Sequence, residues 1–404
     1  MHQSLSAYNS RCLFWAYLFN SLNFLQPVLT LFYLSHGLHP RDLFVIMFCW
    51  SAAVLIGEIP TGVFADKFGP KLSFLTGAAV QMASIGVLFF ADRPWQFFLY
   101  SFLNGFSVTF FSGADEAFLY ESLREDGKTQ MMDQVMGRLQ SADFAASLVA
   151  VILGAWIGKD VTQAQFRLLI LLTLCFQLLQ FIFLVLLRTP RAHTRVVQNH
   201  PFRQVRDGWQ VIRKKPRLLV MFLNVTLVFI PVGAVFKNFD QPFLKAAGVP
   251  VSIIGILYAS AALLGFFVSR SIGWLTRRFP RLLLMQVTGL LSVAGLVLAA
   301  LSHAPIWMAV GTFILLRLTQ VVRYPIYSQI SNDYIPSAVR ATTISLLSII
   351  DSCCDLMVFL VLSFFAGGQS LPVIFIAAAC IALIGTLLPI RSLNDESVKS
   401  DQSL

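Results

Sequence analysis

The sequence has 404 residues, of which 57% are hydrophobic and only 12% are charged, whereas soluble domains are about a quarter charged. Because a membrane-spanning helix needs about 20 apolar residues, most of this chain is predicted to lie in lipid, which leaves no room for a separate soluble catalytic domain. The formal net charge of +10 is concentrated in a few short segments. It therefore indicates membrane topology rather than nucleic-acid binding.

Apolar runs between charged or turn-rich breaks predict twelve membrane-spanning helices in an all-α fold. The first six are expected at 11–34, 42–65, 71–91, 95–121, 135–158 and 165–188. The second six are expected at 218–244, 251–275, 282–301, 305–330, 339–367 and 370–390. The predicted division is an N-terminal six-helix bundle at 1–189, a linker at 190–216, a C-terminal six-helix bundle at 217–391 and a tail at 392–404.

The linker carries the strongest topological signal. From Arg188 to Arg217 the chain holds nine Lys or Arg residues and one acid, Asp207. By the positive-inside rule this segment is cytoplasmic, so both termini are predicted in the cytoplasm. The stretch 202–212 is amphipathic and predicts a surface helix. Short loops and a compact plan favour the cytoplasmic (inner) membrane of a bacterium.

The two predicted halves repeat each other in sequence. Segment 23–27 (NFLQP) returns at 238–242 (NFDQP), the turn at 37–40 returns at 248–250, and 62–68 aligns with 273–279. Three matches in the same order indicate an internal duplication, which is the usual plan of transporters that bind a solute between two halves.

Segment 62–71 reads GVFADKFGPK. It resembles the loop signature G-x-x-x-D-[RK]-x-G-[RK]-[RK] of the major facilitator superfamily, from which only Pro70 departs. With the two sets of six spans and the basic linker, the resemblance covers essentially the whole chain. It implies two pseudo-symmetric six-helix bundles and a cytoplasmic gate; a plain topogenic turn is the alternative reading of the segment. The gate residues that it implies are Gly62, Asp66, Lys67, Gly69 and Lys71.

Two further segments, 57–62 (GEIPTG) and 112–117 (SGADEA), resemble bacterial efflux-type branches of that family. Proton antiporters of the family often carry an Arg in span four, where this chain has Ser101. Their Gly-Pro signature in span five is also missing. Standard drug–proton antiport is therefore not implied by these motifs.

Charged residues inside the spans are candidates for proton coupling. Asp351 and Asp355 share one helix face, and Arg317 lies at a similar depth in span ten. Burial disfavours the charged form of a carboxylate and a nearby arginine favours it, so an Asp–Arg contact that opens during the cycle would carry a proton. A permanent structural pair is the alternative. Asp143 in span five is a second candidate.

Polar residues of spans one, four, seven and ten are the candidates for solute contact, because these helices line the central cavity in the superfamily that the chain resembles. Amides and prolines at 23–27 and 238–242 predict helix interruptions, which lipid tolerates only where they line a cavity. Helix packing without a ligand is the alternative, and the cations favour an anionic solute. The candidates are Asn20, Asn23, Gln26, Asn104, Lys237, Asn238, Asp240, Gln241, Gln320, Arg323 and Tyr324, together with Arg317.

A cytoplasmic charge network is expected near the end of span four. Asp115, Glu116 and Glu121 lie close in the chain to the start of span five, which carries Arg138. A salt-bridge network that supports the gate is favoured over direct ligand binding.

No enzyme motif is found: the chain lacks a phosphate-binding glycine-rich loop, HExxH, GxSxG and metal-ligand spacing, and its six cysteines lie in apolar runs without CxxC. No cofactor or metal is expected. The predicted function is that of a monomeric secondary transporter that moves a small organic solute by alternating access, driven by protons, with export favoured. An importer or facilitator of an anionic metabolite or siderophore-like carboxylate, and a non-transporting membrane sensor, are the alternatives.

Overall fold

The computed structural model describes residues 4–112, 114–190, 216–301, 305–334, 340–367 and 370–389; the side chains at 133, 216–218, 328–334, 340–346 and 348 lie outside this description. All regular secondary structure in the described ranges is helical. The predicted surface helix at 202–212 and the tail at 392–404 fall outside the described residues.

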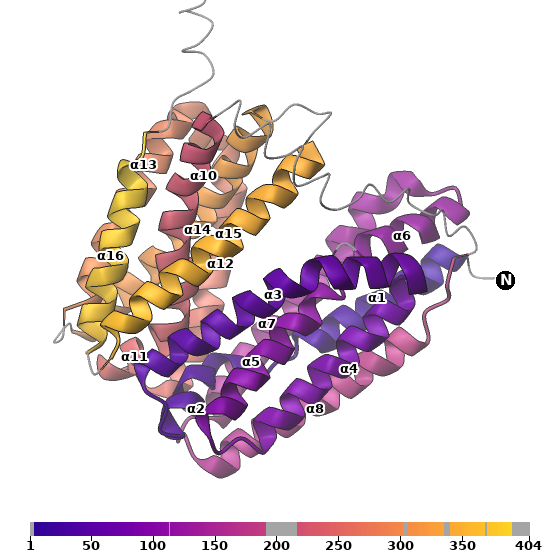
Figure 1. Ribbon diagram of the computed structural model, residues 1–404, viewed down its shortest axis with the longest axis horizontal. Helices are drawn as coiled ribbons and strands as arrows, with labels where there is room; N and C mark the ends of the chain where they lie inside the picture. Colours follow the sequence, from indigo (N-terminus) through magenta and orange to yellow (C-terminus); the bar gives the residue numbers. More distant parts are fainter. Residues whose placement is uncertain are drawn as a thin grey trace, which may run out of the picture. The chain divides into compact units, whose positions relative to one another are not determined.

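The first six predicted spans each coincide with one helix or with consecutive helices (Figure 1). These elements are α1 (Leu5–Ser21), η1 (Gln26–Val28), α2 (Leu29–Ser35), α3 (Pro40–Phe68), α4 (Pro70–Phe89), α5 (Pro94–Thr109), α6 (Ala114–Glu125), η2 (Thr129–Met131), α7 (Met132–Ile157) and α8 (Gln163–Val185).

The second six spans are also found, within a few residues of their predicted bounds. They are α10 (Pro216–Phe229), η3 (Ile230–Phe236), α11 (Lys237–Ala246), α12 (Val251–Arg278), α13 (Arg281–Ala299), α14 (Ile306–Tyr334), α15 (Arg340–Phe365) and α16 (Leu371–Leu387). Among the described residues, nine helical segments are long and apolar enough to cross a membrane. The all-α, membrane-spanning fold is thus confirmed.

The chain forms two compact units. Unit 1 holds α1 to α8 with residues 250–259 at the start of α12, and unit 2 holds α10, η3, α11, the rest of α12 and α13 to α16. The predicted linker lies mostly outside the described residues, so the division at 189 and 217 stays a prediction.

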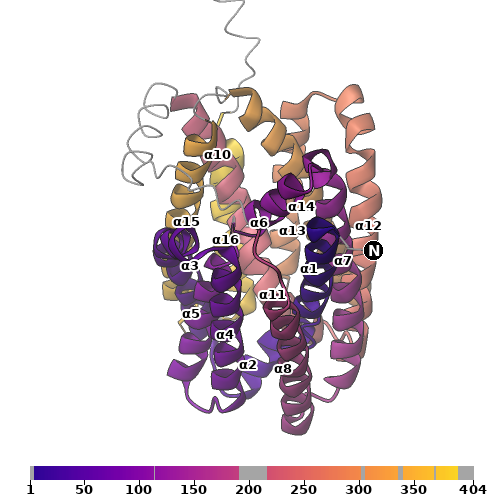
Figure 2. The same cartoon turned by 90° about the vertical axis from the view of Figure 1, so that its right-hand side faces the viewer.

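In unit 1, α5 packs against both α3 and α4, and α1 packs against α7 and α8 (Figure 2). Small and polar residues bring α3 and α5 close together. Thr61 Oγ1 donates to the carbonyl of Thr109 at 2.9 Å, and Ser101 Oγ donates to the carbonyl of Ile46 at 2.7 Å. A Cβ on Gly57 would lie 2.8 Å from Thr109 Oγ1. Small residues of this kind let the backbones of membrane helices approach each other.

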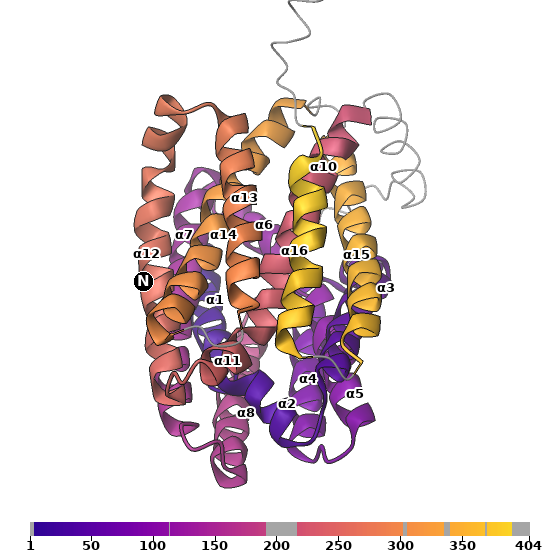
Figure 3. The ribbon, with the colours of Figure 1, turned by 90° about the vertical axis from the view of Figure 1, so that its left-hand side faces the viewer.

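In unit 2, α13 lies against α14 and α16, and α16 also packs against α10 (Figure 3). Gly385 makes the last contact possible, because a Cβ there would lie 2.7 Å from Leu227 Cβ. Large apolar side chains such as Phe364 and Trp274 remain exposed on the outside of their helices, as expected for helices in lipid.

One buried asparagine in each unit ties the first helix to the carboxyl end of the last. Asn9 Nδ2 donates to the carbonyl of Arg188 at 2.8 Å, and its Oδ1 accepts from the Arg188 N–H. Asn224 Nδ2 donates to the carbonyl of Leu388 at 2.9 Å. The two residues stand at the same offset as the repeated segments 23–27 and 238–242. Each helps to satisfy backbone groups that the end of α8 or α16 leaves free.

The predicted helix interruptions are found at only one of the two places. The chain leaves α1 after Ser21 and resumes as η1 at Gln26, so the first interruption is confirmed. Residues 238–242 instead lie inside α11, and the irregular segment is the π-helix η3, further upstream. Pro231 explains the shift: proline lacks an N–H and its ring collides with the carbonyl four residues earlier, so the helix widens there.

The segment 62–71 is not a loop. Gly62, Asp66 and Lys67 belong to the last turns of α3, and Gly69 alone connects α3 to α4. Gly69 has φ +88°, which an L-residue rarely adopts, and Pro70 then begins the next helix with its φ already suited to it. The connection is thus a turn of one residue, and the loop that the resemblance implies is absent.

Candidate functional site

A buried ion pair joins α11 to α14 in unit 2. Arg317 Nη2 lies 2.6 Å from Asp240 Oδ2, with the Asp240 side chain fully buried and that of Arg317 30% exposed. The Arg317 guanidinium also lies over the Phe313 ring, 5.3 Å from its centroid. Charges inside a membrane bundle are costly to desolvate and mark solute or proton pathways. This pair is therefore the centre of the candidate site.

The helix that carries Asp240 widens just before it. In η3 the backbone follows i→i+5 spacing over Ile230–Phe236, and π segments of this kind are frequent at functional sites. Asn238 Nδ2 donates to the carbonyl of Ala234, within that segment, at 2.8 Å. The polar groups around the irregular turn are thus partly engaged by the helix itself.

Asp351 of α15 has a hydroxyl as its partner. Thr226 Oγ1, from α10, donates to Asp351 Oδ1 at 2.8 Å, and no described cation pairs with this carboxylate. Arg317, which the sequence suggested as the switchable partner of Asp351, pairs with Asp240 in this structure. Its exchange between the two carboxylates stays a prediction. Asp355, one turn further along α15, is half-buried and engaged by other groups.

Arg323 is a predicted solute contact whose guanidinium is held by groups of the protein itself. Its side chain is only 1% exposed. Nη1 donates to the carbonyl of Met285 at 2.5 Å, and Nη2 donates to the carbonyl and to Oδ1 of Asn224 at 3.0 and 2.6 Å. The guanidinium therefore links α10, α13 and α14, which is a structural role. Neighbouring Tyr324, by contrast, is 63% exposed.

Two predicted solute contacts have buried amide atoms without hydrogen-bond partners. Asn23 Oδ1 and both terminal atoms of Gln320 have no hydrogen bond in the described part of the chain. A buried polar group left in this way costs about 1–3 kcal/mol, and native structures keep such groups where water or ligand binds. Gln320 lies one turn from Arg317 on α14, which makes it the strongest of the predicted contacts.

The other solute-contact candidates differ in environment. Gln241 is buried, Lys237 and Gln26 are exposed, and Asn104 is half-buried. Asn20 accepts a hydrogen bond of 3.2 Å from Gln81 Nε2. Their roles stay predictions.

A cavity of about 190 Å³ lies inside unit 1, lined by residues of α1, α4, α5, α6 and α8. Tyr17 donates its hydroxyl to Asp115 at its wall, and Gln180, 3% exposed, has an unpartnered Oε1. Tyr17, Gln81 and Gln180 were missed in the sequence, although each is a polar side chain inside an apolar run. Asp143 lies elsewhere in unit 1, where Ser21 donates to it.

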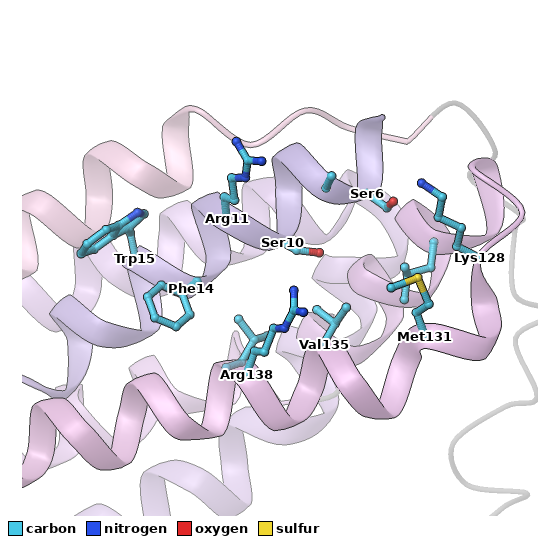
Figure 4. Close-up of a pocket in the computed structure, with 12 residues that line it drawn as sticks. Ser6, Ser10, Arg11, Phe14, Trp15, Lys128, Met131, Val135 and Arg138 are labelled. Carbon is cyan, nitrogen blue, oxygen red and sulfur yellow. The ribbon is translucent and has the colours of Figure 1, made fainter. Parts of the chain in front are cut away.

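The predicted cytoplasmic charge network stays a prediction, and two of its members lie in different places. Asp115 faces the cavity of unit 1 and Tyr17, whereas Arg138 lines a different pocket between α1 and α7 (Figure 4). Glu116 is exposed, and Glu121 is engaged by another group.

The basic residues of segment 62–71 have separate partners. Lys71 Nζ donates to the carbonyl of Leu187, just beyond α8, at 2.6 Å. Lys67 Nζ lies over the Phe68 ring, 5.1 Å from its centroid, and Asp66 is exposed. The gate function of this segment stays a prediction. No cluster of three or more metal-ligating side chains occurs among the described residues.

The family model of the Major Facilitator Superfamily matches residues 12–354. The chain belongs to the Major Facilitator Superfamily. Its similarity to the MFS-type transporter YxaM of Bacillus subtilis is 23% identity over 370 residues, covering 87% of this chain and 88% of that relative. The transporter is therefore a multi-pass membrane protein and not an enzyme.

Two further relatives have names that refer to resistance or efflux. Multidrug resistance protein MdtH of Salmonella typhimurium is 25% identical over 61% of this transporter, and Macrolide efflux protein A of Streptococcus pyogenes is 24% identical over 53%. In each case the match spans 56% of the relative's own length.

Solved structures share the fold. The crystal structure of the nucleoside transporter NupG has a TM-score of 0.72 at 12% identity, and the match covers 95% of this chain and 98% of that one. The D-xylose–proton symporter has a TM-score of 0.70 at 13% identity, covering 96% and 99%. At these identities the likeness is one of architecture alone.

Proposed function

We propose that this transporter moves a small organic solute across a bacterial cytoplasmic membrane by alternating access, coupled to protons and directed outward. The observation that carries the proposal is the Arg317–Asp240 pair, a buried ion pair beside a π-helical turn. Such a pair is costly to desolvate in lipid, and its presence beside irregular backbone is expected for a site that binds and releases a polar group.

Asp351 is the proposed proton carrier. A carboxylate whose described partner is the Thr226 hydroxyl loses little when it takes up a proton, because a hydroxyl serves as donor to the anion or as acceptor to the acid. Asp240, held by an arginine, loses an ion pair when it is protonated. The two carboxylates thus suit different tasks, proton transfer for Asp351 and conformational coupling for Asp240.

The outward direction rests on the relatives named for multidrug resistance and macrolide efflux. Because the transporter spans about half of their length at 24–25% identity, the direction and the solute class are part of the proposal. The proposal includes a monomer, and both termini in the cytoplasm, as the basic linker predicts for the termini.

The test is solute accumulation in proteoliposomes of known orientation, with and without an imposed pH gradient. The panel contains labelled amphipathic cations and organic acids. Wild-type protein is expected to accumulate a solute only with the gradient, and Asp351→Asn is expected to bind the solute with unchanged affinity but to lose gradient-driven accumulation.

The matched control is Ser352→Ala, the neighbouring change on the same helix, which should retain full accumulation. Gradient-driven accumulation that persists in Asp351→Asn would exclude Asp351 as the carrier and move the search to Asp143 or Asp355. Flux that ignores the gradient in the wild type would contradict proton coupling altogether.

A second candidate is uptake or facilitated passage of an anionic metabolite. The exposed Lys237 side chain and the partly exposed Arg317 side chain, on neighbouring helices of unit 2, favour it. The same panel of solutes distinguishes this function from proton-coupled export, because an organic acid would then equilibrate without any pH gradient.

A further inference from the structure

A basic pocket opens between α1 and α7 in unit 1, beside the connection from α6 to η2 (Figure 4). Its volume is about 320 Å³. The lining combines cations, hydroxyls and apolar groups. The lining residues used below are Ser6, Ser10, Arg11, Phe14, Trp15, Lys128, Val135, Arg138 and Leu139.

The cations lie at one end and at the rim of this basic pocket. Figure 4 shows the Arg138 side chain extending from α7 toward Ser10 of α1, and Lys128 near Ser6. Lys128 Nζ also donates to Ser4 Oγ at 3.2 Å. Arg11 stands at the outer edge, with its guanidinium directed away from α7. The lining that the structure describes contains no acid, and neither arginine pairs with a described carboxylate.

Acidic groups nearby are already engaged. The carboxylate of Asp126 accepts hydrogen bonds from the Ser6 backbone N–H at 2.7 Å and from Ser6 Oγ at 2.5 Å. It therefore holds the start of α1 against the end of α6. Lys128 lies close enough to share its charge with Asp126. The charges of Arg11 and Arg138 are left to face an anion from outside the chain.

The apolar side of the pocket continues along the helices toward the middle of the membrane span. Phe14 and Trp15 follow Arg11 along α1 on the side away from Lys128, and Leu139 of α7 also belongs to the lining. Trp15 is 43% exposed. Indole rings favour the zone between headgroups and acyl chains. A cationic end that merges with an exposed apolar groove matches a molecule with an anionic head and a hydrocarbon chain.

We propose that this basic pocket binds an anionic phospholipid. Its phosphate lies between Arg138, Lys128 and the Ser10 hydroxyl, and one acyl chain lies along Phe14 and Trp15. Basic pockets between membrane helices bind anionic headgroups in this way. A free phosphate would gain nothing from the apolar groove, and a zwitterionic lipid would bring its own cation next to the two basic side chains.

The experiment is native mass spectrometry of the purified full-length transporter titrated with phosphatidylglycerol or with phosphatidylcholine of the same acyl chains. Wild-type protein is expected to bind phosphatidylglycerol about tenfold more tightly. The double variant Arg138→Gln, Lys128→Gln should lose that preference, since each basic side chain near the surface contributes measurably to anionic-lipid affinity. Its affinity for phosphatidylcholine should stay the same.

The matched control removes two exposed cations elsewhere, as Arg277→Gln, Arg278→Gln, and should keep the preference. Equal wild-type affinities for the two lipids would overturn the proposal, and so would an equal loss in the control, which would indicate general charge attraction. Soluble glycerol 3-phosphate forms a third arm: binding as tight as that of phosphatidylglycerol would assign the pocket to a free phosphate. The comparison of wild-type affinities for phosphatidylglycerol and phosphatidylcholine tests the proposal even if the double variant fails to fold.

Discussion

The first membrane span of each half has the same backbone plan but different side-chain chemistry. Both have a buried asparagine that reaches the end of the unit's last helix, Asn9 in one and Asn224 in the other. Each of these spans is followed by a glycine of positive φ, +80° at Gly37 after α2 and +87° at Gly248 after α11. The backbone plan that the repeated segments predicted is therefore present in both.

The chemistry inside that plan differs at one position. Leu25, in the middle of the first repeat, is 2% exposed and packs as an apolar residue, whereas its counterpart Asp240 is buried against Arg317. A duplicated membrane bundle needs only an apolar side chain at this position for packing. The carboxylate in unit 2 is thus an addition that packing does not explain, and it makes the two halves unequal.

The largest expected effect comes from replacing Asp240 with leucine, the residue type at the matching position of unit 1. Asp240→Leu removes the counter-ion of Arg317, whose side chain is 30% exposed, so the free energy of unfolding should fall by about 3 kcal/mol, the low end for a broken buried pair. The double variant Asp240→Leu, Arg317→Met should recover most of that loss but not transport. Thermal unfolding in detergent measures the stability of each variant, and solute accumulation in proteoliposomes measures its transport. A single variant as stable as the double variant would show that the ion pair is not what holds Arg317.

A smaller difference is expected between the two asparagines. Asn224→Ala removes an acceptor of the Arg323 guanidinium as well as the donor to Leu388, so about 3 kcal/mol should be lost. Asn9→Ala removes neutral hydrogen bonds only, and about 2 kcal/mol is expected. Thermal unfolding of both variants measures the gap, and equal losses would argue that Arg323 finds another acceptor.

The two glycines should behave alike. Gly37→Ala and Gly248→Ala each force an L-residue into positive φ, although an added Cβ would meet nothing closer than 3.7 Å at either position. Each should cost about 1–2 kcal/mol from backbone strain alone. Gly62→Ala is the control, because that glycine is helical with open space around it and alanine there should be neutral or mildly stabilising. A clear difference between the two glycines in thermal unfolding would contradict the shared plan.

The smallest effect concerns pH and is confined to unit 1. Burial raises the pKa of the Asp126 carboxyl, but the hydrogen bonds from Ser6 and Ser4 and the charge of Lys128 outweigh it, so the pKa is lowered below its usual 3.8. A lowered pKa in the folded state stabilises the protein at pH values above the unfolded pKa, and this contribution is lost as pH falls below about 3.8 through the folded value.

Wild type should therefore exceed Asp126→Asn in stability by less than about 1 kcal/mol at pH 7, as is typical of exposed charged contacts. The gap should close at the acid end of the range, and unfolding midpoints of the two proteins at about pH 7 and about pH 3, below the usual carboxyl pKa, measure it. A gap that is unchanged at the acid pH would mean that the contact does not depend on the carboxylate charge.

The sequence predicts the twelve spans because each is an apolar run long enough to cross a lipid bilayer. The length of such a run does not depend on how the helices pack. It does not predict which charges meet. Arg317 lies in the same span as Arg323, yet one pairs with Asp240 and the other binds backbone carbonyls, since the direction of each side chain depends on helix rotation. The break in the seventh span was misplaced for a similar reason, because Pro231 and Pro242 look alike in sequence.

The connection at Gly69 has a mechanical consequence. Because only one residue lies between α3 and α4, the two helices cannot tilt independently, and a tilt of one must move the other. Lys71 then fastens the start of α4 to the chain just after α8. Three helices, one of them distant in sequence from the other two, are thus mechanically connected, and a movement of segment 62–71 would be transmitted to the end of α8.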